Sequence, residues 1–171
     1  MAVEAGETAP GFTLKATNGH TYNSEDALGR GPMLLMFFKT TCATCDLVCP
    51  YVNRLVEAYP GGWNVWGISQ HPLEESKRYA QAYEIRYPVL LDEGFAVSKV
   101  YDPPSTPTFY LIGMDGEVME RSVGFHKAEL NEISRRLAQC LGLAPVEIAP
   151  EDDGNPSSRP GCSPRHLRPG A

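Results

Sequence analysis

The sequence of 171 residues has no long hydrophobic run and no excess of positive charge. No stretch reaches the roughly 18 apolar residues that a membrane-spanning helix needs. The net charge is −6 and there is no basic stripe, which argues against binding to nucleic acid or to a membrane. The first residues, MAVEAGETAPGFTL, also lack the basic start and apolar core of a secretion signal. We therefore expect a cytoplasmic protein, with a removed export signal as the alternative.

The sequence also lacks the dense, even set of cysteines that cross-links small secreted proteins. It has five cysteines, and three of them, Cys42, Cys45 and Cys49, lie close together. An odd and uneven set is a poor disulfide framework, and a chain of this length buries enough surface to fold without one. Chemistry is therefore the better explanation of the cluster.

The composition changes at residue 143. Residues 143–171 hold six of the fifteen prolines and few large apolar side chains. This composition predicts a Pro-rich tail that is mostly disordered. Residues 1–142 are then expected to form the folded domain.

Within residues 1–142 the sequence alternates between the periods of strands and of helices. Continuous apolar runs predict three buried strands, at 32–38, 63–69 and 87–92. Amphipathic or capped segments predict four helical stretches, at 41–59, 72–85, 95–101 and 127–142. Turn residues predict two hairpins, one around Asn18-Gly19 and one over 106–125. This order indicates an α/β fold with a mixed central sheet flanked by helices.

The segment KTTCATCDLVCP, residues 39–50, places its first cysteine at the start of a predicted helix. Free N–H groups and the helix dipole stabilise a thiolate there, so the pKa of Cys42 should fall. Cys45 can close a disulfide with Cys42, because Cys42 lies outside regular helix geometry. Cys45 and Cys49 would both lie within the helix, with Cβ atoms about 5–6 Å apart against the roughly 3.8 Å that a disulfide prefers. Cys42 and Cys45 are therefore the predicted redox pair, and Cys49 a buried core thiol.

The segment FFKTTCATCDLVCP, followed much later by STPTFYLI, resembles the thioredoxin superfamily. The redox helix of that superfamily carries C-x-x-C and a kinking proline five residues after the second cysteine. GETAPGFTL, YPVLLDEGFAVSKVYD and PTFYLIGMDGEV are similar to its redoxin (AhpC/TSA-type) branch, which includes the TlpA- and ResA-like thiol-disulfide oxidoreductases. The resemblance covers roughly residues 6–141. It implies a thioredoxin-like fold with an N-terminal hairpin as an extension.

The resemblance also implies an activity, namely disulfide exchange with protein disulfide or dithiol substrates and an unidentified electron donor. Cys42 would attack and Cys45 would resolve the mixed disulfide. The bond between Thr106 and Pro107 would be cis, and the backbone of Thr106 would pair with a bound substrate. Thr41, where thioredoxins usually have tryptophan, completes the predicted substrate-binding set. No cofactor or metal is expected, and a monomer is favoured.

One departure from the superfamily concerns the proton of Cys45. Classical thioredoxins have a buried acid six residues before the first cysteine, and this chain has Met36 there. Proton transfer must then use water or another group. Gln70 and His71, just after the strand predicted at 63–69, form the candidate proton relay. A solvated loop histidine is the simpler interpretation of His71.

Two other functions stay open. A peroxiredoxin-like thiol peroxidase would share the fold, but it needs a threonine three residues and a proline seven residues before its reactive cysteine, and Cys42 has Lys39 and Leu35 there. A Sco-like copper chaperone would use C-x-x-x-C-P, which residues 45–50 match. The histidine of that family is missing from YDPPSTP, residues 101–107.

Two cysteines lie far from the cluster. Cys140, beside the apolar stripe of the last helix, is expected to be structural. Cys162 is either an inert, accessible thiol or an auxiliary thiol that reaches the redox loop. A flexible linker from residue 143 to residue 162 spans some 22–26 Å, at about 5–6 Å × √n, so its length does not exclude the second interpretation.

Overall fold

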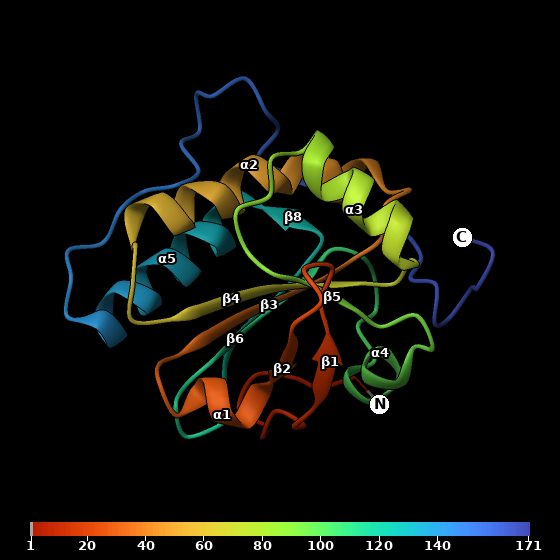
Figure 1. Cartoon of the computed structure of the whole chain (residues 1–171). Coiled ribbons are helices and arrows are strands. Elements are labelled where there is room, and N and C mark those ends of the chain that lie inside the picture. Colours follow the sequence, from red (N-terminus) through yellow and green to blue (C-terminus); the bar gives the residue numbers. More distant parts are fainter. Residues whose placement is uncertain (1) are drawn as a thin grey trace.

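The computed structural model of the chain describes residues 2–171 (Figure 1). Its centre is a five-stranded mixed sheet in the order β5-β4-β3-β6-β7. The strands are β3 (Met33–Phe38), β4 (Asn64–Ser69), β5 (Val89–Leu91), β6 (Thr108–Ile112) and β7 (Val118–Val123). β3, β4 and β5 are parallel, whereas β6 and β7 add antiparallel strands at the other side. The predicted mixed sheet is confirmed.

Helices cover both faces of this sheet (Figure 1). They are α1 (Ser24–Leu28), α2 (Ala43–Ala58), α3 (Leu73–Ala82), α4 (Ala96–Tyr101) and α5 (Lys127–Leu141). One apolar core lies under α2, α3 and α5, and a second lies under α1 and α4. The sequence predicted all of these helices except α1, which has only five residues.

The side chains of β3 show why its sequence is a continuous apolar run. Leu34, Met36 and Phe38 pack into the core under α2, while the alternate residues Met33, Leu35 and Phe37 pack into the other core. All six side chains are buried, because both faces of the strand are covered.

The predicted N-terminal hairpin is also present. β1 (Thr13–Lys15) pairs antiparallel with β2 (Thr21–Asn23). Its turn includes Gly19 at φ +84°, a conformation that glycine adopts without steric cost. The hairpin lies beside β5, where Ala16 forms an isolated bridge with Leu90.

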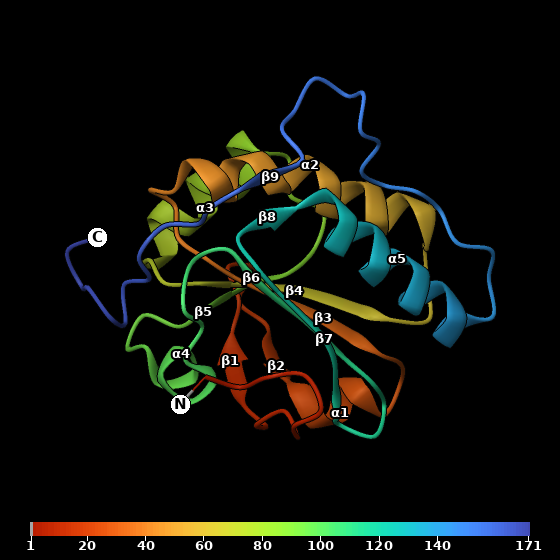
Figure 2. The ribbon, with the colours of Figure 1, turned by 180° about the vertical axis from the view of Figure 1, so that it is seen from behind.

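The structure differs from the prediction of a disordered tail at residues 143–171, which we call the C-terminal segment. Ile148 and Ala149 are buried against the core under α2 and α5. Further on, β9 (Ser158–Arg159) pairs antiparallel with β8 (Phe125–His126). Figure 2 shows the segment running past β8 and the start of α2. Composition does not reveal this arrangement, because most of the contacts use backbone groups of the segment.

No helix among residues 2–171 has both the length and the apolar character needed to cross a bilayer.

Candidate active site

Cys42 lies at the N-cap of α2, four residues after β3 ends. Its backbone is extended, with φ −129° and ψ 113°, and its sulfur accepts a hydrogen bond from the backbone N–H of Cys45 at 3.3 Å. A sulfur at this position satisfies one of the free N–H groups of the first helical turn. The predicted placement of Cys42 at a helix start is therefore confirmed.

The two cysteines of the C-x-x-C have pKa values shifted in opposite directions. The pKa of Cys42 is lowered to about 5, chiefly by the hydrogen bond from the Cys45 thiol, against an opposing effect of burial. The pKa of Cys45 is raised well above its usual value by burial first, and then by the hydrogen bond to Cys42 and its charge. At neutral pH, Cys42 is the thiolate and Cys45 holds a proton. Such a difference suits the predicted roles of Cys42 as the attacking cysteine and Cys45 as the resolving cysteine.

The loop before β6 faces Cys42. The peptide bond between Thr106 and Pro107 is cis, as predicted. The sulfur of Cys42 lies 3.4 Å from the carbonyl oxygen of Thr106. Thr41, by contrast, is exposed beside Cys42. The structure thus brings Cys42, Thr106 and Pro107 together, while the substrate-binding role of Thr41 stays a prediction.

The C-terminal segment adds a third thiol to this site. The sulfur of Cys162 lies 2.7 Å from that of Cys42, outside the covalent distance of about 2.05 Å. Cys162 forms an antiparallel bridge with Thr106, and both backbone hydrogen bonds of the bridge are present, at 2.8 and 2.9 Å. The half-buried Cys162 therefore shares the site with the C-x-x-C pair.

Burial and the hydrogen bond to Cys42 raise the pKa of Cys162. The charge of Cys42 also raises this pKa, whereas the charge of Lys39 lowers it. Lys39 is almost fully buried, directly after β3. The sequence reasoning missed it as part of the electrostatics of the site. A cation shortly before the first cysteine, at the end of a buried strand, was the available signal.

Thr44, inside the C-x-x-C, is the other residue that sequence reasoning missed. It is buried, and its hydroxyl donates a hydrogen bond to the carbonyl oxygen of Pro160 at 2.8 Å. No local pattern indicates this contact, because the residues are 116 positions apart.

Gln70 and His71, the candidate proton relay, contact other parts of the molecule. The Gln70 side chain bonds to Ser98 at 3.0 Å and to His166 of the C-terminal segment at 3.1 Å. His71 is buried rather than solvated, and its Nδ1 lies 2.9 Å from a carboxylate oxygen of Glu75. Burial first, and then the charge of Arg165, lower its pKa. A role of either residue in proton transfer stays a prediction.

The remaining cysteines have different surroundings. Cys49 is fully buried, its thiol donates to the carbonyl oxygen of Cys45, and burial raises its pKa to about 11. The expectation of a core thiol is confirmed. Cys140, in contrast, is exposed on α5, with its sulfur 4.0 Å from that of Met119. Cys140 therefore lies outside the buried stripe of the helix, and a structural role for it stays a prediction.

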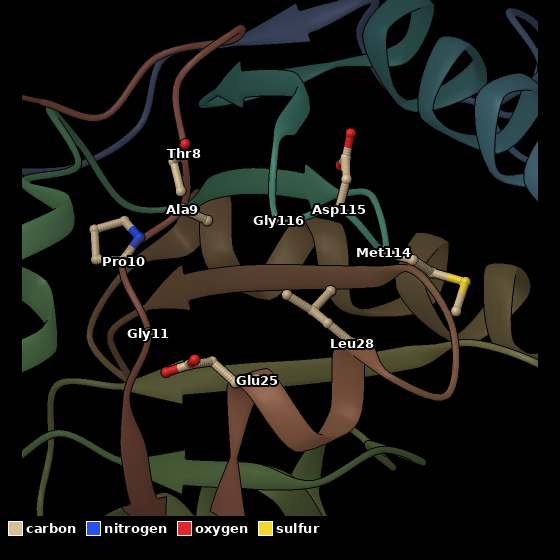
Figure 3. A pocket seen from close by; sticks show the side chains of 9 residues that line it. All are labelled: Thr8, Ala9, Pro10, Gly11, Glu25, Leu28, Met114, Asp115 and Gly116. Atoms are coloured by element: carbon tan, nitrogen blue, oxygen red, sulfur yellow. The ribbon is translucent and has the colours of Figure 1, made fainter.

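The pockets and acidic groups of the structure do not indicate another centre. Among residues 2–171, no group of three or more His, Cys, Asp or Glu side chains is placed to hold a metal ion. A pocket of about 520 Å³ lies between the N-terminal segment, α1 and the turn after β6 (Figure 3). Its lining includes Glu25 and Asp115 and none of the cysteines. Cys42, Cys45 and Cys162 converge elsewhere, beside the loop before β6.

Comparisons with known proteins agree with this geometry. The model of the AhpC/TSA family matches residues 5–121. The thiol-disulfide oxidoreductase ResA of Geobacillus kaustophilus is 30% identical over 138 residues, which cover 80% of this chain and 78% of the relative. The thioredoxin-like protein YneN of Bacillus subtilis is 27% identical over 128 residues, which cover 72% of this chain and 74% of the relative.

A solved structure from Chlorobium tepidum, provisionally assigned as a thiol:disulfide interchange protein DsbE, superposes with a TM-score of 0.74. The match covers 83% of this chain and all of the other one, at 22% identity. At that identity the likeness shows the fold alone, which is thioredoxin-like.

Proposed function

The chain belongs to the AhpC/TSA family, and from that premise we propose that it is a thiol-disulfide oxidoreductase that exchanges disulfides with protein partners. The observation that carries the proposal is the pair of opposite pKa shifts at the start of α2. A thiolate at Cys42 attacks a partner's disulfide, and the protonated Cys45 waits three residues away to resolve the mixed disulfide.

The attack begins at Cys42 because its thiolate is already formed at neutral pH. The new bond joins Cys42 to one sulfur of the partner, and the other sulfur of the partner leaves with the electron pair. Cys45 then loses its proton and attacks the sulfur of Cys42. The partner sulfur that was bonded to Cys42 leaves and becomes a thiol. The Cys42–Cys45 disulfide that remains is reduced again by an electron donor that is not yet identified.

Thr106 supports the recognition of a peptide. Its backbone N–H and carbonyl groups face the site and form a complete antiparallel pair with an extended chain. Backbone pairing of this kind binds many sequences, because it does not depend on side chains.

Reduction of insulin by dithiothreitol tests the proposal. The wild-type protein should accelerate the reaction, and Cys42→Ser should return the rate to that of dithiothreitol alone. Cys140→Ser is the matched control, because it removes an exposed thiol outside the site. Full activity of Cys42→Ser would overturn the assignment. Peroxide consumption with a dithiol donor, measured on the same preparations, tests the thiol peroxidase alternative.

The reduction potential of the Cys42–Cys45 pair tests the direction and the expected cytoplasmic location. A value near about −270 mV is typical of a cytosolic reductant, whereas a value near about −120 mV is typical of an oxidant.

A further inference from the structure

The C-terminal segment occupies the edge at which a substrate is expected to pair. The N–H group of Cys162 donates to the carbonyl oxygen of Thr106 at 2.8 Å, and the N–H group of Thr106 donates to the carbonyl oxygen of Cys162 at 2.9 Å. These are the two bonds of an antiparallel pair, which any extended peptide can form. The protein thus presents part of its own chain to Cys42 in the geometry of a substrate.

Contacts on both sides of Cys162 fix the register of this pairing. Before it, Pro160 accepts the hydrogen bond of Thr44, and β9 pairs with β8. After it, the N–H group of Arg165 donates to the side-chain oxygen of Gln70 at 2.7 Å, and the guanidinium donates to the Gln70 carbonyl at 2.6 Å. A shift by one residue would break these contacts and turn Cys162 away from Cys42.

Two glycines show how closely the segment fits. A Cβ atom on Gly161 would lie 2.5 Å from the carbonyl oxygen of Thr106 and 2.6 Å from the Ser105 hydroxyl. A Cβ atom on Gly124, which has φ +80°, would lie 3.0 Å from the carbonyl oxygen of Arg159. The backbone therefore reaches Thr106 only because both positions lack a side chain.

We propose that residues 157–168 are an internal substrate and that Cys162 is a third redox cysteine, which exchanges a disulfide with Cys42. The proposal rests on the proposed function, because the oxidised Cys42–Cys45 pair supplies the disulfide. The thiolate of Cys162 attacks the sulfur of Cys42, the Cys42–Cys162 bond forms and the Cys42–Cys45 bond breaks. Cys45 leaves with the electron pair of the broken bond and takes up a proton, in place of the one that Cys162 lost. One disulfide exists before and after, so the exchange needs no further oxidant.

The electrostatics of the site favour this step in the oxidised protein. In the reduced protein, the hydrogen bond to Cys42 and its charge help to raise the pKa of Cys162. A disulfide at Cys42 removes that charge, whereas Lys39 stays in place and its charge favours the thiolate of Cys162. Formation of the Cys42–Cys45 disulfide therefore removes two of the effects that raise the pKa of Cys162, while burial, the largest of them, stays.

The same geometry makes the segment a competitor of external substrates. A partner that pairs with Thr106 needs the backbone groups that Cys162 now occupies. Only molecules whose C-terminal segment is displaced can bind such a partner. The apparent affinity for the partner is therefore reduced in proportion to the fraction of these molecules.

Disulfide mapping of the full-length Cys45→Ser variant tests the exchange partner directly. The reduced variant, at high dilution, is treated with a limiting amount of diamide, which takes up the two electrons and two protons of the dithiol. Peptide mass spectrometry without reduction should then recover the Cys42 and Cys162 peptides joined within one molecule. Recovery of Cys162 only as the free thiol, or of Cys42 only in dimers between molecules, would overturn the proposal.

Gly161→Ala tests the seating of the segment while it keeps all five cysteines. In the Cys45→Ser background, it should lower the yield of the Cys42–Cys162 disulfide by roughly tenfold, the effect expected from loss of a pair of backbone hydrogen bonds. In the otherwise wild-type chain, it should lower the KM for insulin by about the same factor, because the site is open. Gly170→Ala is the matched control, since a Cβ atom there would meet no atom within 4 Å. Misfolding would not lower the disulfide yield and at the same time strengthen insulin binding. An unchanged KM would overturn the proposal that the segment competes with external substrates.

The two proposals are tested by separate measurements. Insulin reduction by the wild-type protein reports the proposed function, and the Cys42–Cys162 peptide pair reports the internal substrate. Insulin reduction without that peptide pair would overturn the internal substrate and leave the oxidoreductase in place.

Discussion

Cys45 and Cys162 approach the same sulfur from two regions of the molecule that are built differently. Cys45 is fully buried in the first turn of α2, three residues from Cys42. Cys162 is half-buried, follows the exposed residues 158–160, and is held to Thr106 by backbone hydrogen bonds. One partner of Cys42 is thus a permanent part of the helix, whereas the other is held by contacts that a second peptide can replace.

The largest expected effect comes from removal of the permanent partner. Cys45→Ser should stop repeated turnover in insulin reduction, because mixed disulfides between Cys42 and the substrate are no longer resolved from α2, and a substrate paired with Thr106 displaces Cys162 from Cys42. Non-reducing gel electrophoresis should show these mixed disulfides. Cys162→Ser serves as the comparison and should keep repeated turnover; equal loss of turnover in the two variants would remove the distinction between the regions.

The second effect is a pH dependence of stability that originates at Cys42. Its pKa in the folded protein, about 5, lies below the value of about 8.5 in an unfolded chain. Between these values the unfolded chain binds the extra proton, so the free energy of unfolding of the reduced protein rises with pH, by up to about 1.36 kcal/mol per pH unit. This contribution is complete above about pH 8.5 and is lost as the pH falls towards 5.

Urea unfolding of the reduced wild-type protein and of Cys42→Ser, measured from pH 5 to pH 8.5, checks this dependence. The difference in unfolding free energy between the two proteins should grow with pH. A difference that stays constant over the range would show that Cys42 is not a thiolate. Above about pH 8.5 the raised pKa of Cys45 acts with the opposite sign, because the folded protein then keeps a proton that the unfolded chain loses.

The third effect separates the contributions of the two regions to the Cys42 thiolate. Hydrogen bonds from Cys45 and from Cys162 both lower the pKa of Cys42, and that from Cys45 has the larger effect. Cys45→Ala and Cys162→Ala should therefore both raise this pKa, with the larger rise for Cys45→Ala. The pH dependence of the alkylation rate of Cys42 by iodoacetamide measures it. A Cys162→Ala variant with the wild-type profile would show that the segment does not reach Cys42 in solution.

The smallest effect is expected at Cys49, the second cysteine within α2, which is buried in the core. Cys49→Ala should leave the alkylation profile of Cys42 and the insulin activity unchanged, because the hydrogen bonds of the Cys49 thiol are to the Cys45 carbonyl and the Tyr79 hydroxyl. Its loss should lower the free energy of unfolding by about 1 kcal/mol, as is typical of a single substitution. Thermal unfolding and the alkylation assay check the two statements. A shift in the pH dependence of Cys42 alkylation would show that Cys49 influences the pKa of Cys42.

The sequence predicted the body of the molecule well, because local patterns determine it. A continuous run of six buried apolar residues identifies β3, and the C-x-x-C after that strand identifies the start of α2. The short helix α1 escaped prediction, since five residues do not establish a helical period. The cis bond before Pro107 was predicted from a resemblance and not from the local sequence.

The position of the C-terminal segment could not be predicted in the same way. Its composition indicates disorder, and the contacts that seat it beside Cys42 join residues 56 to 120 positions apart, largely through backbone groups of the segment. Sequence reasoning could show that a linker of this length spans the distance to Cys42. It could not show the antiparallel pairing with Thr106, because backbone hydrogen bonds do not depend on which residues form them.

Lys127, the first residue of α5, has a consequence for the topology of the chain. Its ammonium group, inaccessible to solvent, donates hydrogen bonds to Pro150, Glu151, Asp153 and Asn155. The chain thus travels the whole length of α5, turns through the exposed residues 142–147 and returns to the residue where the helix began. A protease that cuts this exposed turn opens a loop whose two ends are still joined at Lys127. The nicked protein therefore stays one particle, with Cys162 carried on a fragment that is no longer covalently continuous with Cys42.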